Sequence, residues 1–209
     1  CDGLYTETLS PTPDKITRSG MARTFQNIRL WKTQTVFDNV LIAKHCRSTS
    51  SVFSAAFRLN RKEEAAQRAQ VEELLEIVGL SDVKNELATS LPYGKQRRLE
   101  IARALATDPK LLLLDEHTAA LDPATAEKVL EITKNTVEEN HLTCMMITHN
   151  MQSALELGNR TIMMNAGKII LDVTGEERAH MTVADLLDRF KQAAGKALDN
   201  DRMLLSEAE

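Results

Sequence analysis

Four consecutive leucines followed by two acids, at Leu111 to Glu116, constrain the fold of this chain more than any other stretch. An apolar run without polar alternation predicts a strand that is buried on both faces, as in a parallel sheet. Asp115 and Glu116 then fall at the carboxyl end of that strand. In open α/β sheets this edge is where ligands bind, and two adjacent acids there can hold a metal ion and polarise a water molecule. A buried strand can equally run into an acidic loop without a chemical role, so the neighbouring segments decide between the two.

Composition limits the classes of protein to which the chain can belong. Its 209 residues are 43% hydrophobic and 27% charged, which suits one substantial core with an appended piece. The formal net charge of -4, without a basic run, argues against nucleic acid as a partner. Three cysteines without paired spacing indicate ordinary thiols in a reducing compartment. No apolar run reaches the roughly 20 residues of a membrane span, so we expect a cytoplasmic protein that reaches a membrane only through a partner.

Helix and strand signals alternate along the chain. An apolar face at helical spacing predicts a helix over about residues 61–78, and Gly79 ends it. We expect this helix to pack with the helix after Gly94 in one lateral subdomain. The residues of that face are Val71, Leu74, Leu75 and Val78. The other predicted elements are strands at 22–26, 111–116 and 142–147, helices at 36–45, 81–88, 95–107, 123–140, 150–157 and 182–194, and a hairpin over 161–173. This order predicts a mostly parallel α/β sheet with an inserted helical subdomain.

Several of these helices begin with recognisable capping signals. Thr35 precedes the first of them, with Asp38 three residues on, which is the pattern of a capping box. Asp122 stands directly before a proline, a pairing that favours an N-cap followed by proline at the first helical position. Thr182, again with an acid three residues on, opens the last predicted helix.

Five stretches occur in an order that is specific when they are taken together. They are Gln26 after a strand, LPYGKQRR before a helix, LLLLDE, AALD at 119–122, and His149 after a strand. This order resembles the nucleotide-binding subunit of ATP-binding cassette (ABC) transporters, over nearly the whole chain. The resemblance implies an α/β, P-loop NTPase-like core. In that core, residues 36–107 form a helical subdomain, 108–175 a core sheet, and 176–209 a C-terminal helix and tail.

The resemblance also implies a catalytic group at the sheet edge. Asp115 and Glu116 match the Walker B acids, so that Asp115 holds Mg²⁺ and Glu116 activates the attacking water. Gln26 matches the Q-loop glutamine, which approaches the metal and senses the transmembrane partner. His149 matches the switch histidine that reaches the γ-phosphate of ATP. These residue types suit phosphoryl transfer, which needs charge neutralisation and an oriented water.

The resemblance also implies a second group of residues that bind nucleotide, apart from the acids at the sheet edge. Leu91, Tyr93, Gly94 and Lys95 belong to the stretch that matches the signature loop. Backbone amides at Gly94, where a helix opens, suit a phosphate. Asp122 matches the D-loop.

Taken singly, each residue also has an interpretation without function. A glutamine after a strand is usually a surface residue, and a lone histidine is more often structural, so Gln26 and His149 depend on the other motifs. Arg97 and Arg98 suit a solvated helix face better than any nucleic-acid contact. The methionine pairs at 145–146 and 163–164 suit core filling.

The sequence departs from the family pattern at several places. None of its Gly-Lys pairs completes the phosphate-cradling pattern G-x-x-x-x-G-K-[ST], so we expect an N-terminally truncated subunit whose 209 residues do not hydrolyse ATP. Pro92 stands where serine is common in the signature loop, and it removes a hydroxyl and a backbone N–H. Lys95 replaces glutamine, and His117 replaces the usual proline after the acids.

Finer resemblance divides the chain at about residue 115. The first part, especially GMARTFQNIRLW, looks like the ATP-binding subunit of branched-chain amino acid importers. The second part, through MMITHNMQSALELGNR, looks like that of importers for tryptophan-like amino acids, so the chain has the pattern of a recombinant or misassembled sequence.

The complete protein is then expected to bind MgATP between two such subunits, as a homo- or heterodimer, and to drive transmembrane permease subunits from the inner face of the membrane. The alternatives are a soluble ABC-class ATPase that acts on ribosomes or DNA, and a non-catalytic ABC-like binding module. A basic arm would favour the first alternative, and failure to bind nucleotide would favour the second.

Overall fold

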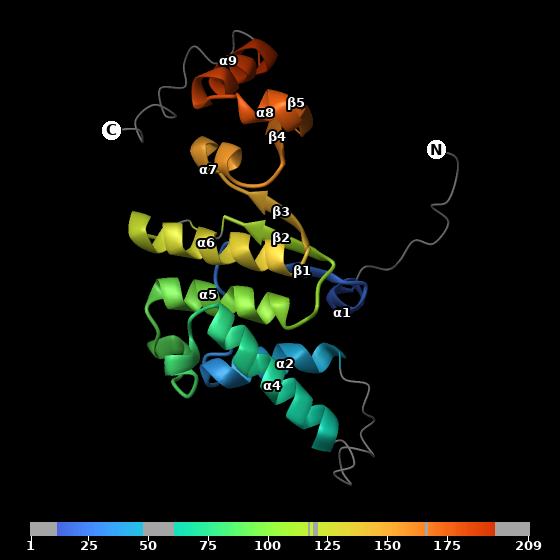
Figure 1. The fold of residues 1–209 in the computed structure, drawn as a ribbon, viewed down its shortest axis with the longest axis vertical. Helices are drawn as coiled ribbons and strands as arrows, with labels where there is room; N and C mark the ends of the chain where they lie inside the picture. The colour runs from blue at the N-terminus through green and yellow to red at the C-terminus, as the bar shows by residue number, and fades with distance from the viewer. Residues whose placement is uncertain (1–11, 48–60, 117, 119–120, 166, 195–209) are drawn as a thin grey trace, which may run out of the picture. The chain divides into compact units, whose positions relative to one another are not determined.

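The computed structural model describes residues 12–47, 61–116, 118, 121–165 and 167–194 (Figure 1). Backbone contacts divide the chain into two compact units, with the boundary between Ile147 and Thr148. Within the described ranges, no helix is both long and apolar enough to cross a membrane.

A parallel sheet organises the first unit. Its strands are β1 (Met21–Arg23), β2 (Leu111–Asp115) and β3 (Thr143–Ile147), in the order β1-β2-β3. Met21 pairs with Leu111, and Leu111 pairs with Thr143, so the three strands start level with one another. Because parallel strands in register end at the same edge, the residues after them are brought together. The α/β class with a parallel sheet is confirmed.

The leucine strand is fully buried on one face only, which corrects the expected burial on both faces. Leu112 and Leu114 are 1% and 0% exposed, whereas Leu111 and Leu113 are half-buried. Helices α5 (Tyr93–Leu105) and α6 (Pro123–Glu139) supply the apolar cluster around Leu112 and Leu114. The pleat of a strand turns alternate side chains to opposite faces, and these two helices cover one of them.

The same alternation appears in β3 and divides the methionine pair there. Met145 is 51% exposed and Ile147 46% exposed, while Met146 packs against the sheet cluster. In the second unit Met164 is likewise exposed, and Met163 packs inward. Core filling therefore holds for one methionine of each pair.

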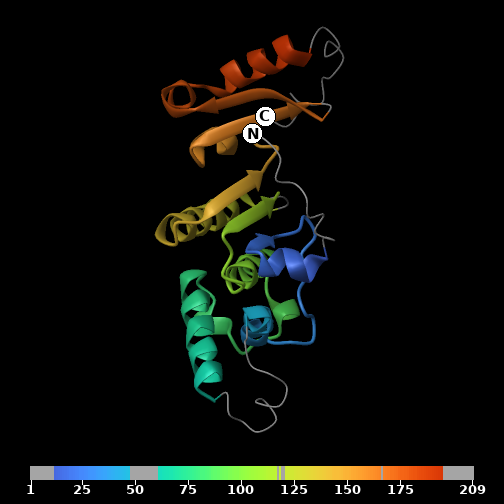
Figure 2. The same ribbon diagram turned by 90° about the vertical axis from the view of Figure 1, so that its right-hand side faces the viewer.

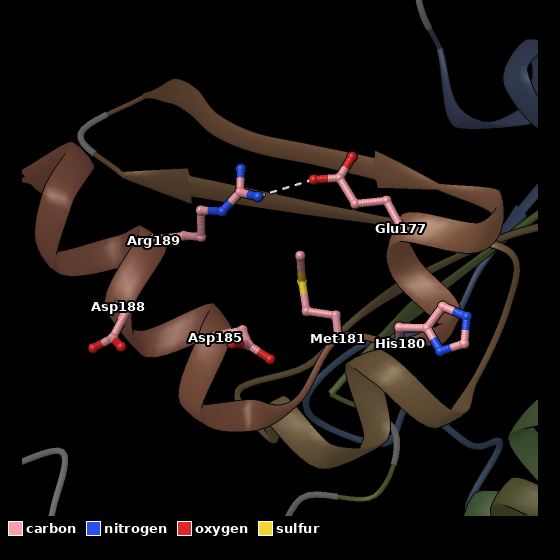
Figure 3. Close-up of a pocket in the computed structure, with 6 residues that line it drawn as sticks. All are labelled: Glu177, His180, Met181, Asp185, Asp188 and Arg189. Carbon is pink, nitrogen blue, oxygen red and sulfur yellow. Dashed lines mark hydrogen bonds and ion pairs between the residues drawn. The ribbon is translucent and has the colours of Figure 1, made fainter.

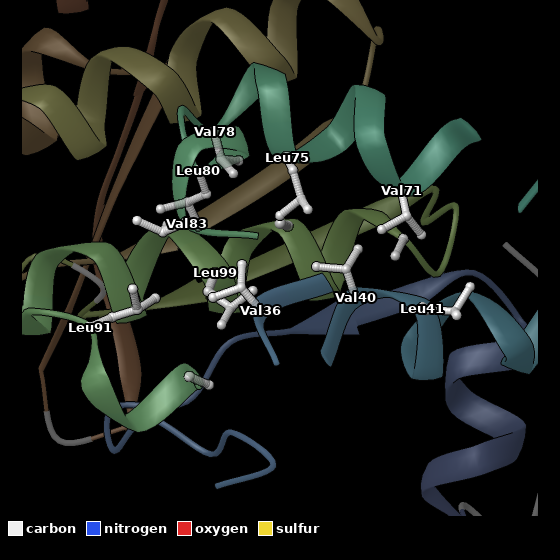
Figure 4. Close-up of a cluster of buried hydrophobic side chains, with 13 residues drawn as sticks. Val36, Val40, Leu41, Val71, Leu75, Val78, Leu80, Val83, Leu91 and Leu99 are labelled. Carbon is white, nitrogen blue, oxygen red and sulfur yellow. The ribbon is translucent and has the colours of Figure 1, made fainter. Parts of the chain in front are cut away.

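A helical layer forms a second core in the first unit (Figure 4). It consists of α2 (Val36–Lys44), α4 (Arg61–Ile77) and the face of α5 that points away from the sheet. Val71 and Leu75 of α4 are fully buried, and Leu74 is partly buried against both clusters, as the apolar spacing predicts. Because α5 contributes Leu99 and Ala102 to this core and Ile101 and Leu105 to the sheet core, it is the element shared by the two layers.

Capping residues fix the helix starts where the sequence indicates. The Thr35 hydroxyl accepts a hydrogen bond from the Asp38 N–H at 3.0 Å and opens α2. The Asp122 carboxylate accepts one from the Thr125 N–H at 3.0 Å and opens α6, with Pro123 at its first position. Gly79 ends α4 in a left-handed conformation, at φ +63°, which glycine adopts without steric penalty.

The helix expected over residues 81–88 is wrong, because the chain forms two separate 3₁₀ turns, η2 (Ser81–Val83) and η3 (Ala88–Ser90). The carbonyls between these turns bond elsewhere. The Lys84 carbonyl accepts from the Phe37 N–H, and the Glu86 carbonyl accepts from the Val36 N–H, both at 2.9 Å. These carbonyls satisfy the free amides at the start of α2 and so do not extend a local helix.

The second unit packs helices on a hairpin (Figure 2). The hairpin strands are β4 (Arg160–Asn165) and β5 (Lys168–Thr174), and α7 (Met151–Glu156) precedes them. The helices α8 (Gly175–Ala179) and α9 (Val183–Ala194) come after the hairpin. Leu171, Val173 and Leu186 are buried together between hairpin and helices. The hairpin and α9 are confirmed, while α8 is not among the predicted elements.

Two short elements complete the described chain. They are α1 (Pro13–Arg18), which lies beside β1, and the 3₁₀ turn η1 (His45–Arg47), which continues from α2.

Candidate functional site

The carboxyl edge of the parallel sheet brings Gln26 and Glu116 together. Gln26 comes after β1 and Glu116 after β2, and the Gln26 Nε2 group donates to Glu116 Oε2 at 3.2 Å. The Glu116 N–H donates to the Ile147 carbonyl at the end of β3 at 3.0 Å. Glu116 has φ +43°, an uncommon conformation for a residue with a side chain, and it turns the chain immediately after the strand. Residues 90 positions apart thus meet where the spacing of the motifs predicts a site.

Asp115 has a partner that no sequence motif predicts. Arg23, the last residue of β1, places its Nη2 group 2.6 Å from Asp115 Oδ2. The Asp115 side chain is 19% exposed and that of Arg23 is 54% exposed, so this ion pair is partly screened by solvent. Only the parallel pairing of β1 and β2 could reveal it, because an arginine in a strand gives no signal of its own.

The acids at this edge suit magnesium in one specific way. Within the described ranges, no group of three or more His, Cys, Asp or Glu side chains could hold a metal ion by itself. Magnesium, however, is usually held through one or two carboxylates together with substrate phosphates and waters. Arg23 binds one oxygen of the Asp115 carboxylate. Because a carboxylate has two oxygens, this ion pair is compatible with a magnesium ion bound at Asp115.

The stretch Leu91 to Lys95 forms the start of α5. The Leu91 side chain is buried in the helical core and its carbonyl accepts from the Gln96 side chain at 2.8 Å. Pro92 occupies the N-cap position and makes no side-chain cap. Tyr93 is exposed, and its hydroxyl accepts from Arg97 at 2.9 Å. The first turn of a thirteen-residue helix therefore begins with its amides uncapped by a side chain, which is the arrangement that favours an anion.

Gly94 lies close against its neighbour on α6. A Cβ atom at Gly94 would come too near Thr125 Cγ2, so a side chain there would force Thr125 to shift. Thr125 belongs to the first turn of α6, which Asp122 caps. The hydrogen bond to Thr125 lowers the pKa of Asp122 and favours its ionised form. Gly94 therefore packs against the first turn of the helix that Asp122 caps.

Lys95 makes an ion pair with a neighbouring turn. Its Nζ atom lies 3.2 Å from Asp82 Oδ2 in the turn η2. A lysine carries no acceptor, so it cannot reproduce the hydrogen bonding of the glutamine that is common in the family.

The expectation that Arg97 lies on a solvated helix face is wrong. It is 1% exposed and is one of the largest fully buried side chains in the described part of the chain. Arg98 is half-buried and donates to the carbonyls of Val78 and Gly79 at 3.0 and 3.2 Å. Neither arginine is a freely solvated charge. No local pattern indicates this, because an arginine pair on a helix usually faces water.

His149 lies in the second unit, between β3 and α7, and its side chain is exposed. The next residue, Asn150, caps α7 by accepting from the Ser153 N–H at 3.0 Å. The expected contact of His149 with the γ-phosphate stays a prediction, as do the roles of the other site residues.

A separate hollow in the second unit has a volume of about 380 Å³ (Figure 3). It lies between α8 and α9, with Arg189 paired to Glu177 at 3.0 Å. The remaining lining residues are His180, Met181, Asp185 and Asp188. None of the predicted site residues lines it. A second hollow, of about 320 Å³, lies in the first unit beside β1 and α5, and Arg23, Phe25 and Glu100 are among the residues that line it.

The sequence matches the protein family described as ABC transporter over residues 4–119. It is 33% identical over 185 residues to the high-affinity branched-chain amino acid transport ATP-binding protein BraF of Pseudomonas aeruginosa, an alignment that covers 88% of this chain and 71% of that protein. It is 35% identical to LivG of Escherichia coli, a protein of the same description, covering 78% of this chain and 65% of LivG. A tyrosine transport ATP-binding protein of Clostridioides difficile is 41% identical over 126 residues, covering 59% of this chain and 50% of that protein.

Among solved structures, the ADP conformation of an ATP-binding cassette of an ABC transporter matches with a TM-score of 0.69 and 26% identity. The match covers 86% of this chain and 71% of that one. A nucleotide-free ATP-binding cassette matches with a TM-score of 0.63, 27% identity and coverage of 80% and 66%. These cassettes confirm the expected fold class.

Proposed function

The chain belongs to the ABC transporter family, and from that premise we propose that it acts in the ATP-binding and ATP-hydrolysing subunit of an amino-acid importer. Its similarity to branched-chain and tyrosine transport proteins supports this substrate class. The chain spans between half and about 71% of the length of these relatives. The activity, substrate and partners proposed here belong to the whole subunit.

One observation of the structure carries the catalytic part of the proposal. Gln26 and Glu116, which are 90 positions apart in the sequence, share a hydrogen bond at the carboxyl edge of the parallel sheet. This edge is where α/β folds bind ligands. The strand register brings the residues after β1 and β2 to this edge, and an amide bonded to a carboxylate there is a pair of groups that can position a metal ion and a water molecule.

In the proposed site, Glu116 is the general base that orients and deprotonates the attacking water, and His149 is a donor to the phosphate. Asp115 and Gln26 would hold Mg²⁺, which supplies charge neutralisation at the phosphates when it is bound. Arg23 keeps the Asp115 carboxylate in place from the neighbouring strand.

The proposed arrangement needs two ATP-binding subunits. Leu91, Tyr93, Gly94 and Lys95, at the start of α5, would contact the nucleotide of the second subunit, and Asp122 would lie beside that contact. Residues of about 36–107 would act as the helical subdomain, 108–175 as the core sheet, and 176–209 as the C-terminal helix and tail. The subunit pair would dock on transmembrane permease subunits at the inner face of the membrane.

The decisive experiment replaces Glu116 by glutamine. Because the 209 residues contain no G-x-x-x-x-G-K-[ST] motif, the variant is made in a subunit that also carries a phosphate-loop segment. We expect Glu116→Gln to keep MgATP binding and to lose roughly 10²- to 10⁴-fold in turnover, as is typical when a general base is removed. Binding is measured by calorimetry and turnover by phosphate release.

Glu127→Gln is the matched control, because Glu127 is a carboxylate on α6 outside the proposed site. Unchanged turnover in Glu116→Gln would remove Glu116 from the mechanism. A parent protein that binds MgATP without turnover would instead be a non-catalytic ABC-like module.

A further inference from the structure

Three charged side chains of α5 bind the backbone of the loop that carries Gln26. Arg97, Glu100 and Arg103 are spaced by three residues, so they project from one side of the helix. The loop runs from Phe25 to Arg29 and lies just after β1 in the chain. A role for this group in positioning Gln26 rests on the proposed function, because Gln26 is part of the proposed site.

Arg97 is the centre of this group. Its Nη1 atom donates to the Phe25 carbonyl at 2.7 Å, and its Nη2 atom donates to the Gln26 carbonyl. Nη1 also donates to Glu100 Oε2 at 2.9 Å, and Nη2 to the Tyr93 hydroxyl at the same distance. A planar guanidinium with donors in a fixed fork can reach these acceptors at once, which a lysine cannot do.

Glu100 and Arg103 extend the same contact. Glu100 is 6% exposed, and its Oε1 atom accepts from the Phe25 N–H at 3.1 Å. Burial raises the pKa of Glu100, and the nearby Phe25 amide and Arg97 oppose that rise. The Arg103 Nη1 atom donates to the Arg29 carbonyl, and burial lowers the pKa of this arginine. The peptide groups at the start of the loop are therefore held by side chains of α5.

A buried charged group of this kind affects the position of the bound backbone more strongly than it affects the stability of the fold. A buried ion pair can often be replaced by apolar residues without loss of stability, because desolvation offsets much of its attraction. Directional hydrogen bonds to the Phe25 N–H, the Phe25 carbonyl and the Gln26 carbonyl instead fix where this backbone lies. An apolar contact would leave it free to slide.

We propose that Arg97 and Glu100 are positioning residues for Gln26. They fix the backbone of Phe25 and Gln26 to α5, so that the Gln26 amide meets Glu116 at the sheet edge. Since α5 begins at Tyr93, the same helix links the start of the proposed signature contact to the proposed water-activating edge. A displacement of α5 is thereby transmitted to Gln26.

Arg98 offers a control on the same helix. It also donates two hydrogen bonds to backbone carbonyls, but these belong to Val78 and Gly79 at the end of α4. Arg97→Lys and Arg98→Lys therefore make the same chemical change one residue apart. Only the first touches the loop that carries Gln26.

The test is nuclear magnetic resonance on the full 209-residue chain, with no nucleotide present. The probes are the side-chain amide of Gln26 and the hydrogen exchange of the backbone amides from Phe25 to Arg29. We expect Arg97→Lys to shift the Gln26 side-chain resonances, because the loop loses hydrogen bonds from Arg97 to the Phe25 and Gln26 carbonyls. The loosened loop should also exchange the Phe25 amide at least about tenfold faster, because the loss of one such bond to a charged donor accounts for roughly this factor. Arg98→Lys should leave both probes unchanged.

Glu100→Gln keeps an acceptor for the Phe25 N–H but removes the charge that faces Arg97. We expect a smaller shift of the same Gln26 resonances, and this variant decides the matter if Arg97→Lys does not fold. A purely structural role would lower global stability in both variants and leave the Gln26 resonances in place, and that result would overturn the proposal. An equal effect of Arg98→Lys would overturn it as well.

The outcome is separable from the proposed ATPase function. Unmoved Gln26 probes would exclude positioning by Arg97 and leave catalysis by Glu116 untouched. In a subunit with a phosphate loop, Arg97→Lys should lower kcat more than it raises KM, because a displaced Gln26 affects the reacting groups rather than nucleotide affinity. An inactive parent subunit would overturn the proposed function but leave the Gln26 probes as a valid test.

Discussion

The two faces of the β2–β3 pair both carry large apolar residues, but only one of the faces is buried. The covered face consists of Leu112, Leu114, Cys144 and Met146, which pack against the helices α5 and α6. The open face carries Leu111 and Leu113, which are half-buried, and Met145 and Ile147, which are exposed, together with Asp115 and Thr143 at the strand ends. Large apolar side chains thus occur on both faces, so their presence alone does not decide burial. Burial depends on which face the connecting helices pack against.

The largest expected effect comes from cutting equal leucines on the two faces. Leu114→Ala should lower the free energy of unfolding by roughly 2–5 kcal/mol, because it leaves a cavity against α5 and α6. Leu113→Ala should lower it by about 1 kcal/mol, because that side chain is only half-buried. Urea unfolding of the 209-residue chain measures both. Equal losses would mean that the open face is covered as well.

The second expected effect is a difference in thiol reactivity between the two faces. Burial raises the pKa of the Cys144 thiol to about 11, from an ordinary value of 9.0. At pH 8 its thiolate fraction is therefore about 100-fold below that of an ordinary thiol, and its alkylation should keep accelerating until the pH approaches 11. A cysteine placed next to it on the open face, by Met145→Cys, should react with iodoacetamide about 100-fold faster, as measured by peptide mass mapping. Similar rates at the two positions would contradict the assignment of faces.

The smallest effect should come from a polar change on the open face. Ile147→Thr should alter the free energy of unfolding by less than about 1 kcal/mol, because threonine keeps strand propensity and its hydroxyl can reach water. Leu112→Thr on the covered face should lower it by more than about 2 kcal/mol, because the hydroxyl would be buried without a partner. Thermal unfolding distinguishes the two. A large loss from Ile147→Thr would show that the open face is packed in solution.

The order of motifs in the sequence predicted the family and the fold class, and the role of Gln26 at the acidic edge was implied by the family resemblance. Local signals were sufficient for the strand ends, for capping residues such as Thr35 and Asp122, and for the stop at Gly79, because these features depend on neighbours in the chain. The expected helix at 81–88 failed for the opposite reason, since its carbonyls bond to α2, which is distant in sequence.

The sequence by itself determined which segments of this protein become helices and strands, with the exceptions of α1, the stretch 81–88 and α8, and that Asp115 and Glu116 stand at the end of a strand. Only the tertiary structure decided which face of that strand is covered, that Arg23 pairs with Asp115, and that Arg97 and Glu100 are buried against the Gln26 loop. The physical reason is the range of the interactions. Backbone propensity and capping act within a few residues, whereas burial and ion pairing join residues about 70 to 90 positions apart that meet only when the chain packs.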